Sequence, residues 1–280
     1  MQLFAISTFA LILLTAAGAP AKMTNDYVEA VIQGRQLAQQ ILAQKPAESF
    51  TNTGVLKIRD ANGRTSEVPV QCTVIVTATD WQSVYTAFLT NGTETLRVVP
   101  SPIQANPEVM GGPDWKISRP VFFPNLTNES IGPWFSYQRN IPVTGRSNDV
   151  RWQSVITTGP EKSFAGSDFS IGDLGLEFFY WPQQKILKHE MRRGRSCKVL
   201  ESNNPSPSPV SYSRVVSWID NQTLGIVQAE AYDAKGRLLK EFYPKTFKKV
   251  NGQWELQEME IRNDQTGSRT RLEFDLKRLD

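Results

Sequence analysis

The sequence predicts a mainly β protein with some helix (α+β), built on one large antiparallel sheet. Between positions 270 and 277, mostly apolar and charged residues alternate, which puts one set on a buried face and the other in water. About six strand-like segments follow one another between Cys197 and Leu276, each closed by turn residues. Tight-turn signals such as Asn251-Gly252 and Asp233–Gly236 separate these segments. Such a long meander predicts a single, strongly curved sheet.

The first 21 residues are predicted to be an export signal rather than part of the fold. Residues 3–17 form an apolar run without a charged side chain, too short to span a bilayer comfortably. Small residues follow and give Ala-x-Ala cleavage sites after Ala19 or Ala21. The alternative is an anchor that stays attached. The remaining residues, 22–280, show no composition break and are predicted to form one domain.

Composition limits the partners and the cofactors. The 280 residues are 40% hydrophobic and 21% charged, which is ordinary for a globular protein, and the net charge of +3 does not indicate a nucleic-acid partner. Cys72 and Cys197 would form one bridge in an oxidising compartment or remain buried thiols, and both alternatives stay open. No Cys-x-x-Cys or other zinc-ligand spacing is present in the sequence, and no metal or cofactor is predicted.

The N-terminal half is predicted to contain a helix followed by two hairpins. Apolar residues recur at helical spacing in Asp26–Gln44, and Pro46 ends this helix. Its apolar stripe would pack on the sheet. The predicted hairpins pair Gly54–Arg59 with Val68–Thr77, and Trp81–Leu89 with Thr95–Val99 around Asn91-Gly92.

Two segments fall outside the hairpin pattern. Pro100–Gly145 is rich in proline, glycine and aromatic residues and is predicted to be a long loop or short-helix excursion packed on the domain. In Ser167–Trp181, Ser170 and Asp173 form a capping pattern ahead of an aromatic cluster. Pro182 stops this segment.

Several linked motifs resemble the bacterial outer-membrane lipoprotein-sorting group, relatives of the periplasmic lipoprotein carrier LolA. The resemblance covers Lys162 to the C-terminus well and the earlier residues only in outline. It depends on the order and spacing of several motifs rather than on one. The motifs are Phe164–Leu174, Arg195–Glu201, Tyr212–Asp220, Ala231–Lys240, Trp254–Met259 and Asn263–Thr270.

The resemblance implies an incomplete antiparallel β-barrel covered by helices, with a cavity that takes up acyl chains. It also implies a non-enzymatic, monomeric periplasmic carrier for outer-membrane lipoprotein sorting, which collects lipidated proteins from an inner-membrane exporter and passes them to an outer-membrane acceptor. This chain departs from the family by its length and by the aromatic segment 100–145. No family residue of known role is carried over.

An acyl chain needs a dry concave wall more than it needs polar groups, because each buried methylene contributes about 0.8 kcal/mol. The sequence has enough aromatic residues to build such a wall. The alternative, for each of them taken singly, is an ordinary core position. The candidates are Trp81, Tyr85, Phe88, Phe122, Phe123, Trp134, Phe135, Phe178, Phe179 and Trp181.

Catalysis has little support in the sequence. The only histidine, His189, is accompanied by no Gly-x-Ser-x-Gly motif and is interpreted as a solvated strand residue. Asp168 and Asp173 fit helix capping better than acid–base chemistry. The basic run 185–198 is interpreted as a solvated hairpin, or else as a site for anionic headgroups. Two further hypotheses remain: an envelope interaction or sensor module of the same fold, with a filled core, and a hydrolase that uses His189.

Overall fold

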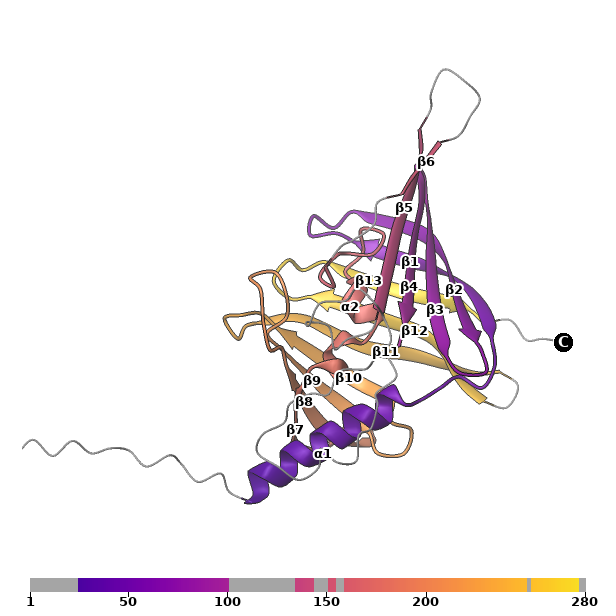
Figure 1. Cartoon of the computed structure of the whole chain (residues 1–280). Coiled ribbons are helices and arrows are strands. Elements are labelled where there is room, and N and C mark those ends of the chain that lie inside the picture. The colour runs from indigo at the N-terminus through magenta and orange to yellow at the C-terminus, as the bar shows by residue number, and fades with distance from the viewer. Residues whose placement is uncertain (1–24, 101–133, 144–150, 155–158, 251–252, 277–280) are drawn as a thin grey trace, which may run out of the picture.

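The computed structural model describes residues 25–100, 134–143, 151–154, 159–250 and 253–276, which form three helical segments and 13 strands (Figure 1). The helical segments are α1 (Asn25–Leu42), α2 (Ile171–Leu174) and the 3-10 helix η2 (Glu177–Tyr180). The strands are β1 (Phe50–Arg59), β2 (Thr65–Val76), β3 (Trp81–Leu89), β4 (Gly92–Val99), β5 (Trp134–Val143), β6 (Arg151–Ser154), β7 (Gln183–Arg192), β8 (Arg195–Asn203), β9 (Arg214–Asp220), β10 (Ile226–Tyr232), β11 (Leu238–Val250), β12 (Gln253–Asn263) and β13 (Arg269–Asp275).

All of these strands belong to one antiparallel sheet, in the order β6-β5-β4-β3-β2-β1-β13-β12-β11-β10-β9-β8-β7. The strands β6 and β7 lie at the two edges and do not pair with each other in the described residues, so the curved sheet stays open. Within the curve lie α2 and η2, and α1 runs along the β7 edge (Figure 1). The predicted incomplete barrel with helical cover is therefore confirmed.

The predicted C-terminal meander is confirmed as β8 to β13, in which each strand pairs with the next. Gly236 and Gly267 have positive φ angles of 73° and 75°, which the two turns need and glycine adopts without strain. The turn residues Asn251 and Gly252 lie outside the described residues. The strand β1 closes the meander onto the N-terminal hairpins by pairing with β13.

The prediction of a loop or short-helix excursion over Pro100–Gly145 is wrong for residues 134–143. These residues form β5, which pairs with β4 so that Val98 lies opposite Phe135 and Leu96 opposite Tyr137. Tyr137 is buried and Phe135 is half-buried, so the aromatic residues alternate with polar ones as in any one-sided strand. The prolines and glycines of the segment masked this short alternation, and residues 101–133 and 144–150 lie outside the described residues.

The sheet buries side chains on both faces, but unequally. We call the face that packs against α1, α2 and η2 the inner face. It carries two large apolar clusters, one with α1, η2 and strands β7 to β10, the other with β1 to β5, β12, β13 and the loop before α2. A smaller cluster of Cys197, Val199, Val216 and Trp218 lies on the outer face. Arg192 stacks on Trp218 at 4.6 Å and shields it from water.

Both cysteines are free and buried. Cys72 lies on the inner face beside Leu56 and Phe164, whereas Cys197 belongs to the outer cluster. Six strands separate β2 from β8, so the two thiols are much too far apart for a disulfide. Burial raises the pKa of the Cys72 thiol to about 11 and also raises that of Cys197, which makes both poor nucleophiles.

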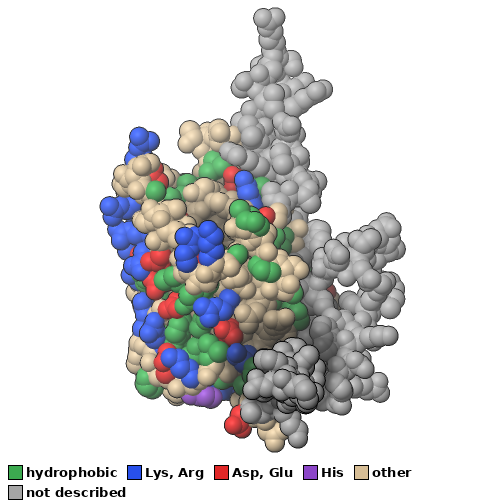
Figure 2. Space-filling model, turned by 90° about the vertical axis from the view of Figure 1, so that its left-hand side faces the viewer, with side chains coloured by type: hydrophobic (Ala, Val, Ile, Leu, Met, Phe, Trp, Pro, Cys, Tyr) green, Lys and Arg blue, Asp and Glu red, His purple; other side chains and the backbone are tan. Residues whose placement is uncertain are grey.

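The basic run of β7 and β8 forms a hairpin whose turn, Arg193-Gly194, has two positive φ angles. Its cations are largely matched by carboxylates. The pairs are Lys185 with Glu201 at 3.2 Å, Lys188 with Glu190 at 2.7 Å, Arg192 with Glu230 at 3.6 Å, and Arg195 with Asp220. In Figure 2, which views the left-hand side of Figure 1, Lys and Arg side chains gather along one edge with Asp and Glu between them. This pairing favours the solvated hairpin over a headgroup site.

The helix α1 packs closely on the edge strand β7 because Gly34 faces it. A methyl group on Gly34 would lie 2.6 Å from the Cα and backbone N of Lys185. Leu37, Ala38 and Ile41 continue this buried stripe. No described helix is both long and apolar enough to cross a membrane.

The mutation Gly34→Ala is therefore expected to destabilise the protein. In an ordinary helix interior the same change stabilises by about 0.5–1 kcal/mol. Here the methyl group meets backbone that cannot rotate away, so we expect a loss of about 1–3 kcal/mol in the free energy of unfolding. Urea unfolding of Gly34→Ala measures it, with the exposed Gln36→Ala of the same helix as a control that should change by less than about 0.5 kcal/mol. A stabilised Gly34→Ala variant would refute the close contact.

Candidate functional site

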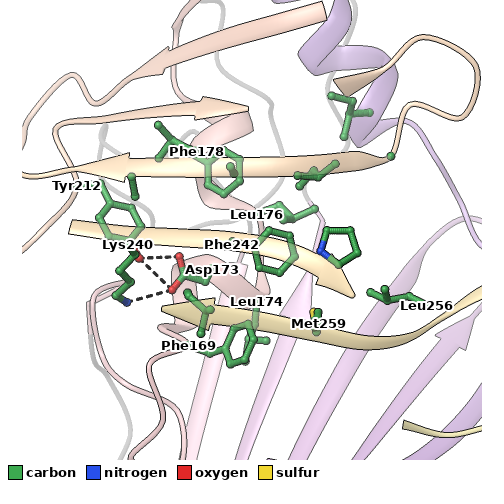
Figure 3. Close-up of a pocket in the computed structure, with 18 of the residues that line it drawn as sticks. Phe169, Asp173, Leu174, Leu176, Phe178, Tyr212, Lys240, Phe242, Leu256 and Met259 are labelled. Carbon is green, nitrogen blue, oxygen red and sulfur yellow. Dashed lines mark hydrogen bonds and ion pairs between the residues drawn. The ribbon is translucent and has the colours of Figure 1, made fainter. Parts of the chain in front are cut away.

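An apolar cavity of about 350 Å³ lies between the inner face of the sheet and the segment that carries α2 and η2 (Figure 3). Its floor is formed by β9 to β12, through side chains such as Val215, Ala229, Phe242 and Met259. Its roof consists of Phe169, Leu174, Leu176 and Phe178, and the end of α1 contributes Ile41. Most of the lining is hydrocarbon, as an acyl ligand requires.

The roof is held in place by the predicted capping pattern. The Ser170 hydroxyl accepts from the backbone N of Asp173 at 3.1 Å, and the Asp173 carboxylate accepts from the backbone N of Ser170 at 2.8 Å. This capping box starts α2, which lasts only one turn. Leu176 then adopts a left-handed conformation with φ of 50°, which ends the turn and starts η2. The abrupt change of direction presents Leu174, Leu176 and Phe178 to the cavity.

The loop before α2 is fastened to the rest of the sheet by two carboxylates. Glu94 of β4 is buried and accepts from the backbone N of Ala165, at 2.7 Å. Asp168 accepts from the hydroxyl groups of Ser268 and Thr270 on the β13 side, at 2.5 and 2.9 Å. Asp173 thus acts in capping as predicted, while Asp168 fastens the loop to β13 instead.

One end of the cavity is polar. Asp173 accepts from the hydroxyl of Tyr212 at 2.8 Å and lies 3.3 Å from the ammonium of Lys240, which also donates to the backbone oxygen of Asp168 at 2.7 Å (Figure 3). Burial, and then the charge of Asp173, raise the pKa of Tyr212 well above its usual value. Burial, with Glu161 and Asp173 nearby, also raises the pKa of Glu177 to about 7. Asp173, Tyr212 and Lys240 close the end of the cavity at which β10 turns into β11, whereas Glu177 does not line it.

The opposite end of the cavity is its mouth. Gln44, after α1, donates to the backbone oxygen of Thr223 at 3.2 Å, and Phe247 and Leu256 line the cavity beside it. Both Gln44 and Phe247 are exposed, whereas the polar end is mostly buried.

Two adjacent irregularities in β11 and β12 shape this mouth. Pro244 lies opposite Met259, Thr246 opposite Glu258, and Phe247 opposite Leu256, so each strand contains one extra residue here. The extra residues shift the alternation, and as a result Phe247 and Leu256 face the cavity like Pro244 and Met259. Proline fits at this point because it removes a hydrogen-bond donor where the ladder is already irregular.

The predicted wall residues fall into several places. Tyr85 and Phe178 line the cavity. Phe179 and Trp181 are buried in the core cluster under α1, and Phe135 packs in the cluster of β1 to β5. Trp81 is half-buried and Phe88 exposed, both on β3. Trp134 starts β5, but its side chain lies outside the described residues. Phe122 and Phe123 lie outside the described residues altogether.

Sequence reasoning missed most of the lining, because it looked for aromatic residues. Much of the floor is aliphatic and comes from the inner-face positions of the meander, such as Val215, Ala229 and Ile261. Alternation with polar residues places Ala229 and Ile261 on one face of their strands, but it does not tell which positions border a void. Tyr212 and Lys240 gave no signal, since their partner Asp173 is distant in the chain.

The described residues give no support for metal or histidine chemistry at the cavity. His189 is exposed on β7 and does not line it. No group of three or more His, Cys, Asp or Glu side chains that could hold a metal occurs in the part of the chain that the structure describes.

Comparison with known proteins agrees with this architecture. A family model described as an uncharacterized protein matches residues 150–280. A DUF1329 family protein from Desulfovibrio piger superposes with a TM-score of 0.64 at 18% identity, over 90% of this chain and 93% of that one. A candidate outer membrane lipoprotein-sorting protein domain from Vibrio parahaemolyticus gives 0.62 at 18% identity, over 88% and 92%. No curated protein matches the sequence significantly.

The fold is thus shared with these two solved structures, and it agrees with the fold that the resemblance of the sequence motifs implies. At these identities the likeness concerns the arrangement of the chain. The function has to be argued from the cavity.

Proposed function

We propose that this protein is an exported periplasmic carrier that holds the acyl chains of lipids or lipidated proteins in its cavity, without catalysing a reaction. In this proposal residues 1–21 are a cleaved signal peptide and residues 22–280 form one domain. An inner-membrane exporter would supply the cargo, and an outer-membrane acceptor would receive it. The cavity itself is the observation that carries the proposal.

The size and lining of the cavity suit a hydrocarbon chain. A volume of about 350 Å³ falls within the range of about 300–1,000 Å³ typical of ligand pockets. About ten buried methylenes would contribute about 8 kcal/mol of transfer free energy, from which the cost of ordering the chain is subtracted. The fold agrees, since the Vibrio parahaemolyticus relative is described as a candidate lipoprotein-sorting domain. Tyr85 and Phe178 are the predicted wall residues that we place in the site.

The rival hypothesis of an interaction or sensor module expects a filled core. The apolar void between the sheet and its roof favours the carrier instead.

Two measurements test the proposal. Native mass spectrometry of the protein purified from a bacterial host should detect bound lipid. After the lipid is removed, an acylated peptide should bind far more tightly than the same peptide without its acyl chain. His189→Ala should leave this binding unchanged, whereas a hydrolase that uses His189 would lose its turnover. Absence of both co-purifying lipid and acyl-dependent binding would refute the carrier.

A further inference from the structure

At the mouth of the cavity, two large apolar side chains project from the β11–β12 hairpin. Trp254 is 71% exposed, the most exposed large hydrophobic side chain in the described residues, and Phe247 is 51% exposed. Leu256 lies opposite Phe247, and Trp254 lies two positions before Leu256 on β12. Residues two apart on a strand share a face, so Trp254 continues the cavity lining outward.

Two lysines lie beside these rings, Lys249 on the same face of the hairpin and Lys248 on the opposite face. Lys248 and Lys249 are both exposed, and Lys249 lies opposite Trp254. Lys248 donates to the backbone oxygen of Leu276 at 2.6 Å. Glu255 lies opposite Lys248, but within the described ranges no carboxylate forms an ion pair with either lysine. By contrast, the neighbouring Lys245 pairs with Glu260 at 3.6 Å.

We call Phe247, Lys248, Lys249 and Trp254 the mouth rim. We propose that the mouth rim docks the protein on an anionic phospholipid bilayer. Trp254 and Phe247 lie among the headgroups, and the two ammonium groups lie at the lipid phosphates. Exposed aromatic rings beside lysines are the combination that membrane interfaces select, because the rings favour the headgroup region and the cations are attracted to its negative potential.

The position of the mouth rim favours a bilayer over a peptide. Both rings are exposed on a hairpin, and Trp254 lines no groove that a peptide could fill in the described residues. Phe247 belongs to both the cavity lining and the mouth rim, so docking would align the cavity with the hydrocarbon region. Phe50, at the start of β1, adds a further exposed ring at the same end of the sheet, where β11, β13 and α1 also end. The purpose of docking, which is to bring the cavity to its cargo, rests on the proposed function. The vesicle-binding test does not depend on that function.

The test is co-flotation of the full-length mature protein with vesicles. Vesicles of phosphatidylcholine with about one-third phosphatidylglycerol should bind the protein, and pure phosphatidylcholine vesicles or high salt should weaken the binding. The double change Lys248→Glu/Lys249→Glu should lower the partition coefficient at least about 25-fold, since each lysine near an anionic surface contributes about a factor of five. Trp254→Ser should lower it about tenfold.

Matched controls lie at the opposite end of the sheet. Phe88 is 47% exposed and Val210 67%, so Phe88→Ser and Val210→Ser remove similar exposed apolar groups. Lys162→Glu/Lys235→Glu reverses two exposed charges there. All of these controls should bind vesicles like the unmodified protein. Equal losses in the controls, or vesicle binding that is absent or insensitive to the mouth-rim changes, would overturn the proposal.

Brominated lipids provide a local readout. Bromine on the upper acyl carbons should quench tryptophan emission on docking, and this quenching should fall sharply in Trp254→Phe. Undiminished quenching would show that another surface touches the bilayer.

A second measurement separates docking from acyl binding. Neither Trp254 nor the two lysines line the cavity, so Trp254→Ser/Lys248→Glu/Lys249→Glu should bind a soluble acylated peptide with unchanged affinity. Loss of vesicle binding with retained peptide binding supports docking. Failure of peptide binding in the unmodified protein would refute the carrier instead.

Discussion

Replacement of Ala229 by Trp is expected to reduce the affinity for an acylated peptide about 50-fold. Ala229 lies on the cavity floor, and the indole would fill space that a hydrocarbon chain needs. Excluding about three methylenes removes about 2.4 kcal/mol of transfer free energy, which corresponds to roughly that factor. Isothermal titration of the lipid-free variant measures it.

The matched control is Ala234→Trp, the same change in the exposed β10–β11 turn, which should bind like the unmodified protein. Ala231→Phe is a smaller filling change on the same floor and should give an intermediate loss. Near-ultraviolet circular dichroism must show that the variants keep their packing. Unchanged binding in both filled variants would mean that the ligand lies elsewhere.

The second large effect is expected for Asp173→Ala, which should lower the free energy of unfolding by about 4 kcal/mol. The change removes half of the capping box and leaves the Tyr212 hydroxyl and the Lys240 ammonium without their carboxylate. Lys240 and Asp173 are only 15% and 12% exposed, so the stranded charge is costly. For a protein of this size, we expect the melting temperature to fall by roughly 10 °C.

Two further variants separate the contribution of the side-chain cap from that of the Asp173 charge. Ser170→Ala removes only the side-chain cap and should cost about 1 kcal/mol. Asp173→Asn keeps an acceptor for Tyr212 but not the charge, and should fall between the two. Should Asp173→Ala cost no more than Ser170→Ala, the polar end would contribute nothing to stability.

The strand β12 shows which inward-facing positions the sequence pattern can predict. Met259 and Ile261 alternate with charged residues in the sequence, and both pack in an inner-face cluster. Leu256 does not fit this alternation, because the extra residue Gln257 lies between Leu256 and Glu258. An extra residue of this kind leaves no mark in a single sequence, since it is defined by the pairing with β11.

The strand β5 shows the same limit in another form. Its alternation is short and lies beside a stretch rich in proline and glycine, so local composition outweighed it in the prediction. Pairing with β4 is what makes the segment a strand, and that pairing depends on residues about 40 positions earlier in the chain.

The sequence by itself determined the curved antiparallel meander, the leading helix, the capping box at Ser170 and Asp173, and the resemblance to the lipoprotein-sorting group, because local periodicity and turn chemistry specify such features. Only the tertiary structure decided that the two cysteines lie on opposite faces, that Tyr212 and Lys240 meet Asp173, and that a hollow remains between roof and floor. A void is the difference between the volume enclosed by backbone and the volume of the side chains that enter it. That difference depends on residues brought together from the whole chain, and no local pattern encodes it.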